Sequence, residues 1–172
     1  MRNHTQMEFD KPMKFQVLRV LICIVLGYAV LGCGSSTIPN TTVEDTSDNR
    51  AVVQFVEKYR HAVQRKDVAA LLSLASPRYL DDNGSPAGTD DIDYENLKAR
   101  LTLWKDNVLD VRYEIRYRNI TYRETTVWVD YTYTGNYRIK SPDGTTRWSR
   151  RLADNRLILD NRGDSFLILS GM

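Results

Sequence analysis

No apolar run in this sequence is long enough to be an ordinary membrane-spanning helix. The longest run follows Arg19 and ends at Cys33, and it holds thirteen almost wholly apolar residues before the cysteine. A helix that spans a bilayer needs roughly 20. A short apolar run that follows basic residues is typical of a secretory signal peptide. The sequence therefore predicts that residues 1–32 are a signal peptide, with an uncleaved signal anchor as the alternative.

Cysteine and histidine are scarce, with two of each in 172 residues. Removal of residues 1–32 leaves one cysteine, Cys33, and one histidine, His61. No internal disulfide can then brace the chain, so its stability must come from an apolar core. One histidine cannot build a multi-histidine metal site. The sequence predicts neither a metal site nor a cofactor.

The sequence also lacks an excess of charge of either sign. It has 24 basic and 22 acidic residues, and removal of residues 1–32 takes away four basic and two acidic ones, which leaves twenty of each. Proteins that bind nucleic acid or an anionic membrane surface usually present a basic patch. We therefore expect no nucleic acid and no anionic lipid surface as a partner.

The last residues of the apolar run, Val30-Leu31-Gly32-Cys33, resemble the lipobox of bacterial lipoproteins. In that family signal peptidase II cuts before the cysteine, and the cysteine thiol carries a diacylglycerol. The resemblance implies that Cys33 is lipidated and becomes the mature N-terminus, anchored in the bacterial cell envelope. An acylated Cys33 could not act as a nucleophile with His61. In that family an aspartate directly after the cysteine is the signal for retention in the inner membrane. Because Gly34 stands at this place, the resemblance implies the outer membrane, facing the periplasm, in a bacterium with two membranes.

Between the lipobox and the first helical pattern the chain is polar. Residues 34–48 contain only Ile38 and Val43 as apolar side chains, too few to bury a core. The sequence predicts that residues 33–48 form a flexible tether, with a root-mean-square reach on the order of 20 Å. Residues 49–172 are then one domain of ordinary size.

Three helices are predicted in the first half of this domain. Apolar residues recur at spacings of three and four in a long stripe: Val52, Phe55, Val56, Tyr59 and Val63. Asp67 is expected to cap a shorter helix that ends before Pro77, and Asp91 or Asp93 is expected to cap a third, with Leu101 and Trp104 on its apolar face. The acidic stretch 81–91, between the second and third predicted helices, is expected to be a loop. It does not fit a calcium-binding EF-hand loop, which would need glycine where Pro86 stands and glutamate where Ile92 stands.

After Asp110 the pattern changes to strands. Apolar and polar residues alternate, which places Tyr113, Tyr117, Tyr131 and Tyr133 on the face that the helices cover. Ser141-Pro142-Asp143-Gly144 is expected to turn a hairpin. Helices followed by antiparallel strands predict an α+β fold.

Two segments of this domain, FVEKYRHAVQRKDVAALLSLASPRYLD and LILDNRGDSFLILSGM, resemble the nuclear-transport-factor-2-like superfamily. This fold is shared by ketosteroid isomerases and polyketide cyclases. The resemblance implies a cone-shaped fold in which N-terminal helices close over a curved antiparallel sheet and leave a pocket inside.

The catalytic residues of ketosteroid isomerases are only partly present. Tyr59 precedes Asp67 by eight residues, as their tyrosine precedes the matching aspartate. Their base falls on Asn83, beside Asp82, and their protonated acid falls near Leu152. An amide cannot abstract a proton and leucine cannot donate a hydrogen bond to an enolate. The sequence therefore disfavours isomerase chemistry, with Asp82 left open as a substitute base.

A ligand pocket is the alternative use of this fold. If Trp148 and Leu152 point inward, Arg150 and Asp154 on the same strand face do too. The candidate ligand-binding residues are Tyr59, Tyr131, Tyr133, Trp148, Arg150 and Asp154. Two simpler interpretations stay open: Tyr59 is a core tyrosine, and Arg150 and Asp154 form a structural ion pair.

These features favour an envelope lipoprotein whose domain binds a small apolar or aromatic ligand, or a protein partner, without catalysis. The alternatives are a cyclase, dehydratase or isomerase with a non-standard base, and a scaffold component of an envelope machine. The outer sheet face is expected to carry Trp128 and many charges: Arg112, Glu114, Arg116, Arg118, Asp130, Arg147 and Arg151. Burying such charges is costly, so we expect a monomer or a weak dimer.

Overall fold

The computed structural model describes residues 36–82, 88, 90–163 and 165–172. Within these ranges, helices α2 (Ser47–Arg65), α3 (Val68–Leu74) and α4 (Tyr94–Asn107) precede four long strands. The strands are β3 (Val108–Arg123), β4 (Thr126–Lys140), β5 (Thr146–Asn161) and β6 (Phe166–Ser170), and they form an open antiparallel sheet in the order β3-β4-β5-β6. The short β1 (Leu80–Asp81) and β2 (Ile92–Asp93) pair separately. The predicted α+β fold is confirmed.

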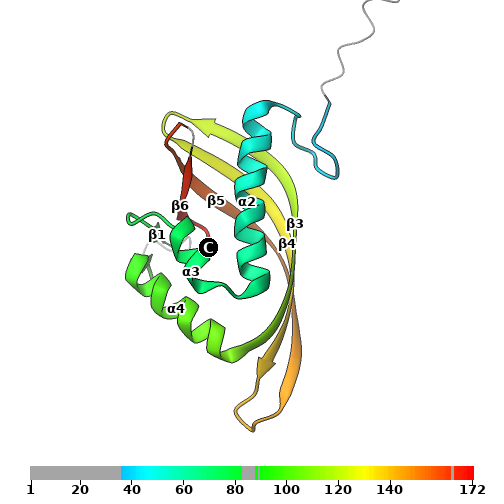
Figure 1. Ribbon diagram of the computed structural model, residues 1–172, viewed down its shortest axis with the longest axis vertical. Helices are drawn as coiled ribbons and strands as arrows, with labels where there is room; N and C mark the ends of the chain where they lie inside the picture. Colours follow the sequence, from blue (N-terminus) through cyan, green and yellow to red (C-terminus); the bar gives the residue numbers. More distant parts are fainter. Residues whose placement is uncertain (1–35, 83–87, 89, 164) are drawn as a thin grey trace, which may run out of the picture. The chain divides into compact units, whose positions relative to one another are not determined.

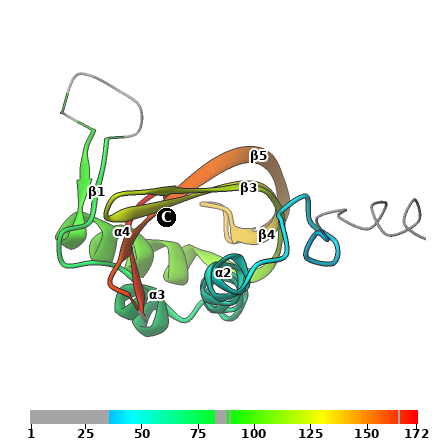
Figure 2. The same ribbon diagram turned by 90° about the horizontal axis from the view of Figure 1, so that it is seen from above.

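The three helices lie on one side of the curved sheet, as Figures 1 and 2 show from two directions. Residues 36–172 form a compact unit with its own hydrophobic core, in which the inner faces of the helices meet the inner face of the sheet. A unit that contains its own core can in principle fold alone. No helix within the described ranges combines the length and the apolarity that crossing a bilayer requires.

The helix boundaries follow from capping residues. The side chain of Thr46 accepts a hydrogen bond from the Asn49 amide and starts α2, and the predicted stripe of this helix is buried. Asp67 accepts from the Ala70 amide at 3.0 Å, and Asp93 accepts from the Asn96 amide at 2.8 Å. Both aspartates thus satisfy backbone donors that a helix start leaves free. The predicted caps of α3 and α4 are confirmed, with Asp93 as the residue that caps α4.

The end of α2 is tied to the end of α4 by a lysine. Lys66 adopts a left-handed backbone conformation, with φ of 54°, and ends α2. Its ammonium group donates to the carbonyl of Lys105, at 3.2 Å, and to that of Val108. A cation at the C-terminus of a helix is favourable because it lies against the unsatisfied carbonyls there.

The strand alternation holds for β3 and β4. Tyr113, Tyr117, Tyr131 and Tyr133 are all buried against the helices, as predicted. A register shift between Tyr117 and Asn119 marks a β-bulge in β3. A bulge lets one strand carry an extra residue and increases the local twist of the sheet.

The predicted inner face of β5 is wrong. Trp148 and Leu152 are exposed, by 53% and 65%, whereas Leu157 and Leu159 on the opposite face of the same strand are completely buried. Arg151, which was predicted on the outer face, therefore faces inward with the two leucines. Trp148 and Leu152 therefore point away from the helices, which lie on the other side of the sheet (Figures 1 and 2).

Residues 36–46 were predicted as part of a flexible tether, but they pack onto the domain. Val43 is buried, and Thr37 forms an isolated β-bridge with Glu44. The Thr42 hydroxyl donates to the carbonyl of Arg118 at 2.7 Å, beside the bulge in β3. Since β3 is an edge strand of the sheet, this segment covers backbone groups that would otherwise be open to pairing.

Candidate functional site

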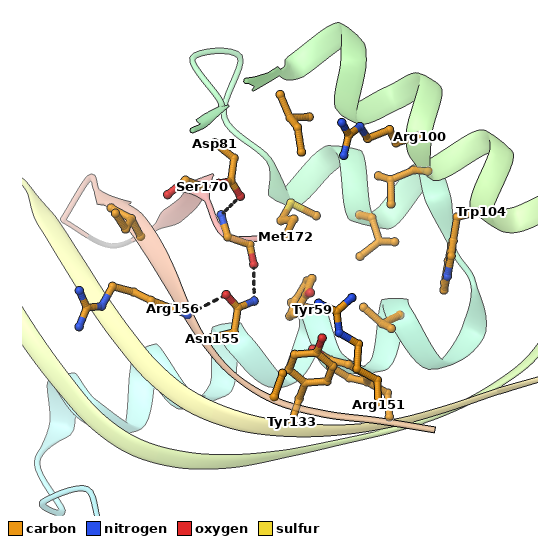
Figure 3. A pocket seen from close by; sticks show the side chains of 18 of the residues that line it. Tyr59, Asp81, Arg100, Trp104, Tyr133, Arg151, Asn155, Arg156, Ser170 and Met172 are labelled. Atoms are coloured by element: carbon orange, nitrogen blue, oxygen red, sulfur yellow. Dashed lines mark hydrogen bonds between the residues drawn. The ribbon is translucent and has the colours of Figure 1, made fainter. Parts of the chain in front are cut away.

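A cavity of about 770 Å³ lies between the helices and the inner face of the sheet. Its size is within the range of about 300–1,000 Å³ that small-molecule sites usually have. Figure 3 shows it from close by. Apolar and aromatic side chains make up much of its lining: Val63, Leu71, Ile92, Leu101, Trp104, Met172 and the tyrosines Tyr59, Tyr113, Tyr133 and Tyr137.

The tyrosines form one cluster in the wall of the cavity. The ring of Tyr59, from α2, meets the ring of Tyr113 edge-on, with centroids 6.3 Å apart and planes at 89°. Tyr113 in turn packs against Tyr133 at 5.3 Å. Tyr131 is completely buried next to Tyr133, at 6.3 Å, and it is not among the residues that line the cavity. Edge-to-face and offset contacts of this kind stabilise aromatic pairs and hold the rings in fixed orientations.

The hydroxyls of Tyr59, Tyr113 and Tyr131 are protonated at neutral pH. Burial raises the pKa of Tyr59 and of Tyr113 well above the usual range for a phenol. Burial also raises the pKa of Tyr131, but hydrogen bonds from Tyr113, Asn155 and Tyr59 oppose the effect and the pKa is about 12. A protonated phenol can donate a hydrogen bond to a ligand, but it cannot act as a base.

Asn155 connects the tyrosine cluster to the chain beyond β6. Its amide nitrogen donates to the Tyr131 hydroxyl and to the Gly171 carbonyl, each at 2.9 Å. Its amide oxygen accepts from the Arg156 backbone at 2.9 Å. On the other side, the Gly171 amide donates to Asp81 at 2.9 Å and the Met172 amide donates to the Tyr79 hydroxyl at 3.1 Å. These bonds hold Met172 in the wall of the cavity (Figure 3).

Two arginines enter the lining from opposite walls. Arg151 rises from β5 beside the tyrosines, and Arg100 extends from α4 (Figure 3). Both residues are exposed to solvent, which places them at the mouth of the cavity. Asp81 and Asp82 also line the cavity, from the loop that follows α3.

The ring of Tyr137 lies over Gly135, one pleat earlier on β4. A Cβ atom added at Gly135 would fall well inside van der Waals contact with the Tyr137 ring and hydroxyl. Gly135 pairs with Arg151 across the sheet. The absence of a side chain at this glycine therefore lets the Tyr137 ring lie beside Arg151, where burial raises the pKa of Tyr137 to about 12.

Of the six ligand-binding candidates, the structure brings three tyrosines together at the cavity, leaves Asp154 at its border, and places Trp148 and Arg150 on the outer face of the sheet. Tyr59 and Tyr133 line the cavity and Tyr131 lies beneath them. Trp148 is exposed on the outer face of the sheet, with the Arg112 guanidinium 5.7 Å from its ring centroid. Its predicted inward orientation is wrong.

Arg150 and Asp154 were expected to point inward if Trp148 and Leu152 did, and the exposed Trp148 and Leu152 show that this condition is not met. Arg150 is exposed and lies on the same face as Trp148. Asp154 borders the cavity, but its carboxylate accepts hydrogen bonds from Arg118 at 2.7 Å and from Thr132 at 2.6 Å on the outer face. The suggested pair of Arg150 with Asp154 is replaced by the pair of Arg118 with Asp154.

The positions matched to ketosteroid isomerases give a mixed result. Leu152 is on the outer face, so no group at this position can reach a ligand in the cavity. Asp82 lines the cavity. Asn83 and the lipidation candidate Cys33 lie outside the described residues.

Sequence reasoning missed Arg151, Arg100 and Gly135. A signal for Arg151 was present: Leu157 and Leu159 belong to the apolar stretch Leu157-Ile158-Leu159 near the end of β5, and counting back from them by twos reaches Arg151. The orientation of Arg100 and the contact of Gly135 with Tyr137 depend on tertiary packing, for which the sequence has no local signal.

No protein-family model and no curated protein matches the sequence. Solved structures do match its fold. A conserved protein from Planctomyces limnophilus is 11% identical, with a TM-score of 0.59, over 73% of this chain and 98% of that one. A proposed dehydratase of the NTF2-like family from Streptomyces avermitilis is 16% identical, with a TM-score of 0.56, over 73% and 94%.

A ketosteroid isomerase-like protein from Erwinia carotovora atroseptica is also similar. It is 14% identical, with a TM-score of 0.56, over 73% of this chain and 93% of that one. Similarity at these identities shows the fold alone, because this fold carries many unrelated functions. The domain has the nuclear-transport-factor-2-like α+β fold.

Proposed function

We propose that this protein is a lipid-anchored protein of the bacterial cell envelope whose domain binds a small apolar or aromatic molecule without catalysing a reaction on it. The observation that carries the proposal is the cavity of about 770 Å³, whose lining combines aromatic and aliphatic side chains with polar and charged ones. Burial of apolar surface in such a cavity supplies most of the binding free energy, and a few polar groups orient the ligand.

The polar groups of the cavity support binding more than catalysis. The hydroxyls of Tyr59 and Tyr113 stay protonated at neutral pH, because burial raises their pKa, so they serve as hydrogen-bond donors. The position that would carry the second acid of a ketosteroid isomerase is Leu152, on the outer face. A binding protein needs neither a base nor that acid.

Fluorescence titration with N-phenyl-1-naphthylamine, a neutral aromatic probe, tests the proposal on residues 36–172. We expect one saturable site with increased probe emission. Ala153 lines the cavity, so Ala153→Trp should fill part of it and abolish binding. The matched control is Leu152→Trp, at the adjacent exposed position, which should bind as the parent does. No saturable binding, or equal binding by both variants, would refute the proposal.

The anchor is tested separately, on the full chain. We expect labelled fatty acid to enter the protein through the Cys33 thiol, and Cys33→Ala to accumulate as an unprocessed, unlabelled precursor. Incorporation of label into the Cys33→Ala protein would contradict this part of the proposal.

Proton transfer is the second candidate function, because Asp82 lines the same cavity as Tyr59. A carboxylate and a protonated phenol in one cavity are the two groups that enolisation of a ketone requires. If the domain is an enzyme of this kind, it will exchange the α-protons of a bound ketone for deuterium, and Asp82→Asn will stop the exchange. Exchange no faster than in buffer would favour simple binding.

A further inference from the structure

We infer that the ligand of this cavity is an acid: a small aromatic or apolar molecule with one oxyanion group, which Arg151 binds. The inference rests on the proposed binding function and adds the chemical class of the ligand. The apolar part would lie against Trp104 and the tyrosines, and the oxyanion would lie beside Arg151, which Figure 3 shows next to Tyr133.

The first argument is the state of the two arginines. On the outer face of the sheet, Arg118 and Arg156 each pair with an aspartate, at 2.7 Å and 2.6 Å. Within residues 36–82, 88, 90–163 and 165–172, neither Arg151 nor Arg100 has a salt-bridge partner. A guanidinium group offers a planar set of donors that fits a carboxylate, so an arginine without an ion-pair partner beside the cavity can bind an oxyanion.

The second argument is the position of Arg151 within the sheet. Arg151 faces Gly135 across the strand pair, and the Tyr137 ring lies over that glycine. The Tyr137 hydroxyl, with a pKa of about 12, is protonated at neutral pH and is a further donor at this place. A cation and a neutral hydroxyl donor side by side favour an anion over a neutral ligand.

The carboxylates of the cavity do not remove this preference. Asp81 lies on the side of Ser170 and Met172 (Figure 3) and accepts hydrogen bonds from the Gly171 amide at 2.9 Å and from the Tyr79 hydroxyl at 3.3 Å. Asp82 follows it in the same loop. Asp81 and Asp82 come from the chain after α3, and the third acidic residue of the lining, Asp154, is paired with Arg118 on the outer face, whereas Arg100 and Arg151 come from α4 and β5. The lining thus has an acidic part and a basic part, and a ligand with one anionic end will be oriented by them.

A matched pair of probes tests the inference on residues 36–172. N-phenyl-1-naphthylamine and 8-anilino-1-naphthalenesulfonate share one ring skeleton, and only the second carries an oxyanion. We expect the sulfonate to bind about ten-fold more tightly, which is the effect of one charge-assisted hydrogen bond. Arg151→Gln should weaken sulfonate binding about ten-fold and change binding of the neutral probe less than about two-fold.

Arg150→Gln is the control, because Arg150 is the adjacent arginine of the same strand but lies on the outer face. It should bind both probes as the parent does. 1-Naphthoic acid should displace the neutral probe at lower concentration than 1-naphthamide, its uncharged analogue. Circular dichroism checks that both variants keep the parent fold.

The outcomes distinguish the proposed binding function from the preference for an acid. If neither probe binds, the proposed binding function is wrong and the inference falls with it. If the neutral probe binds as tightly as the sulfonate, or if Arg150→Gln loses as much sulfonate affinity as Arg151→Gln, the cavity binds apolar molecules without preference for an acid and the inference alone is wrong.

Discussion

Replacement of Asn155 by leucine tests whether its three hydrogen bonds hold the wall of the cavity. Leucine has a similar size but no hydrogen-bonding group. The change therefore removes bonds of 2.9 Å to the Tyr131 hydroxyl, the Gly171 carbonyl and the Arg156 amide. Tyr131 is completely buried, so its hydroxyl cannot turn to water instead.

The expected cost follows from the number and burial of these bonds. A typical hydrogen bond contributes about 1 kcal/mol to stability, and a buried group left without its partner costs about 1–3 kcal/mol. Three bonds, one to a completely buried hydroxyl, give an expected loss of about 2–4 kcal/mol in the free energy of unfolding. For a domain of this size that is a large share of the total.

Urea denaturation of residues 36–172 measures this loss, with the slope of the transition as a check on two-state behaviour. The control is Asn136→Leu, on the outer face of β4 and opposite the exposed Arg150, which should change stability by less than about 0.5 kcal/mol. A loss below about 1 kcal/mol for Asn155→Leu, with an unchanged slope, would show that these bonds contribute little.

Four further predictions concern stability and assembly. Gly171→Ala should destabilise the domain by at least about 2 kcal/mol, because φ is 92° and a Cβ atom would overlap the Arg156 carbonyl; an unchanged urea midpoint would contradict this. Trp104→Ala should cost about 2 kcal/mol, less than for a completely buried tryptophan, since Trp104 is half-buried beside the cavity; a midpoint equal to the parent's would place it on the surface. The ion pairs of Asp160 with Arg162 and Arg78 lower the pKa of Asp160, so the stability that they contribute is present above about pH 4 and is lost as the pH falls further. Asp160→Asn should therefore make the urea midpoint depend less on pH below about pH 4. An equal pH dependence in the variant and the parent would show that these ion pairs do not contribute to stability. The domain should sediment as a monomer or weak dimer at micromolar concentration, and a dimer that persists at nanomolar concentration would show that the outer face, with its exposed Trp148 and Leu152, is an interface.

The helices could be predicted well because their signals are local. The stripe on α2 has the spacing of a helix, and Asp67 and Asp93 stand where a capping side chain reaches a free amide. The order of helices and antiparallel strands then led to the correct α+β fold. These features depend on residues only three or four positions apart in the sequence.

The cavity could be predicted only in part. The tyrosines of β3 and β4 were assigned to the correct face because Val127, Val129 and the tyrosines alternate along a strand that helices cover for most of its length. For β5, Trp148 and Leu152 suggested the wrong face, since both are exposed on the outer face although they are apolar. Apolar character indicates the inner face of a strand only where another layer lies over it.

The packing of residues 36–46 could not be predicted from composition. One buried valine and a hydrogen bond from Thr42 to the Arg118 carbonyl attach this segment to β3. The acceptor in that bond, the Arg118 carbonyl, is at the bulge in β3 and far from Thr42 in the sequence. This carbonyl is free to accept a hydrogen bond only in the folded sheet.

The contact between Gly135 and Tyr137 makes the capacity of the cavity depend on one backbone position. Because the ring occupies the space that a side chain at residue 135 would need, any larger residue there would push the ring towards the cavity or out of the sheet. Neither the tyrosine cluster nor the two arginines would have to change. Residue 135 can therefore act as a size filter: chains that differ only here would share one ligand chemistry but admit molecules of different width.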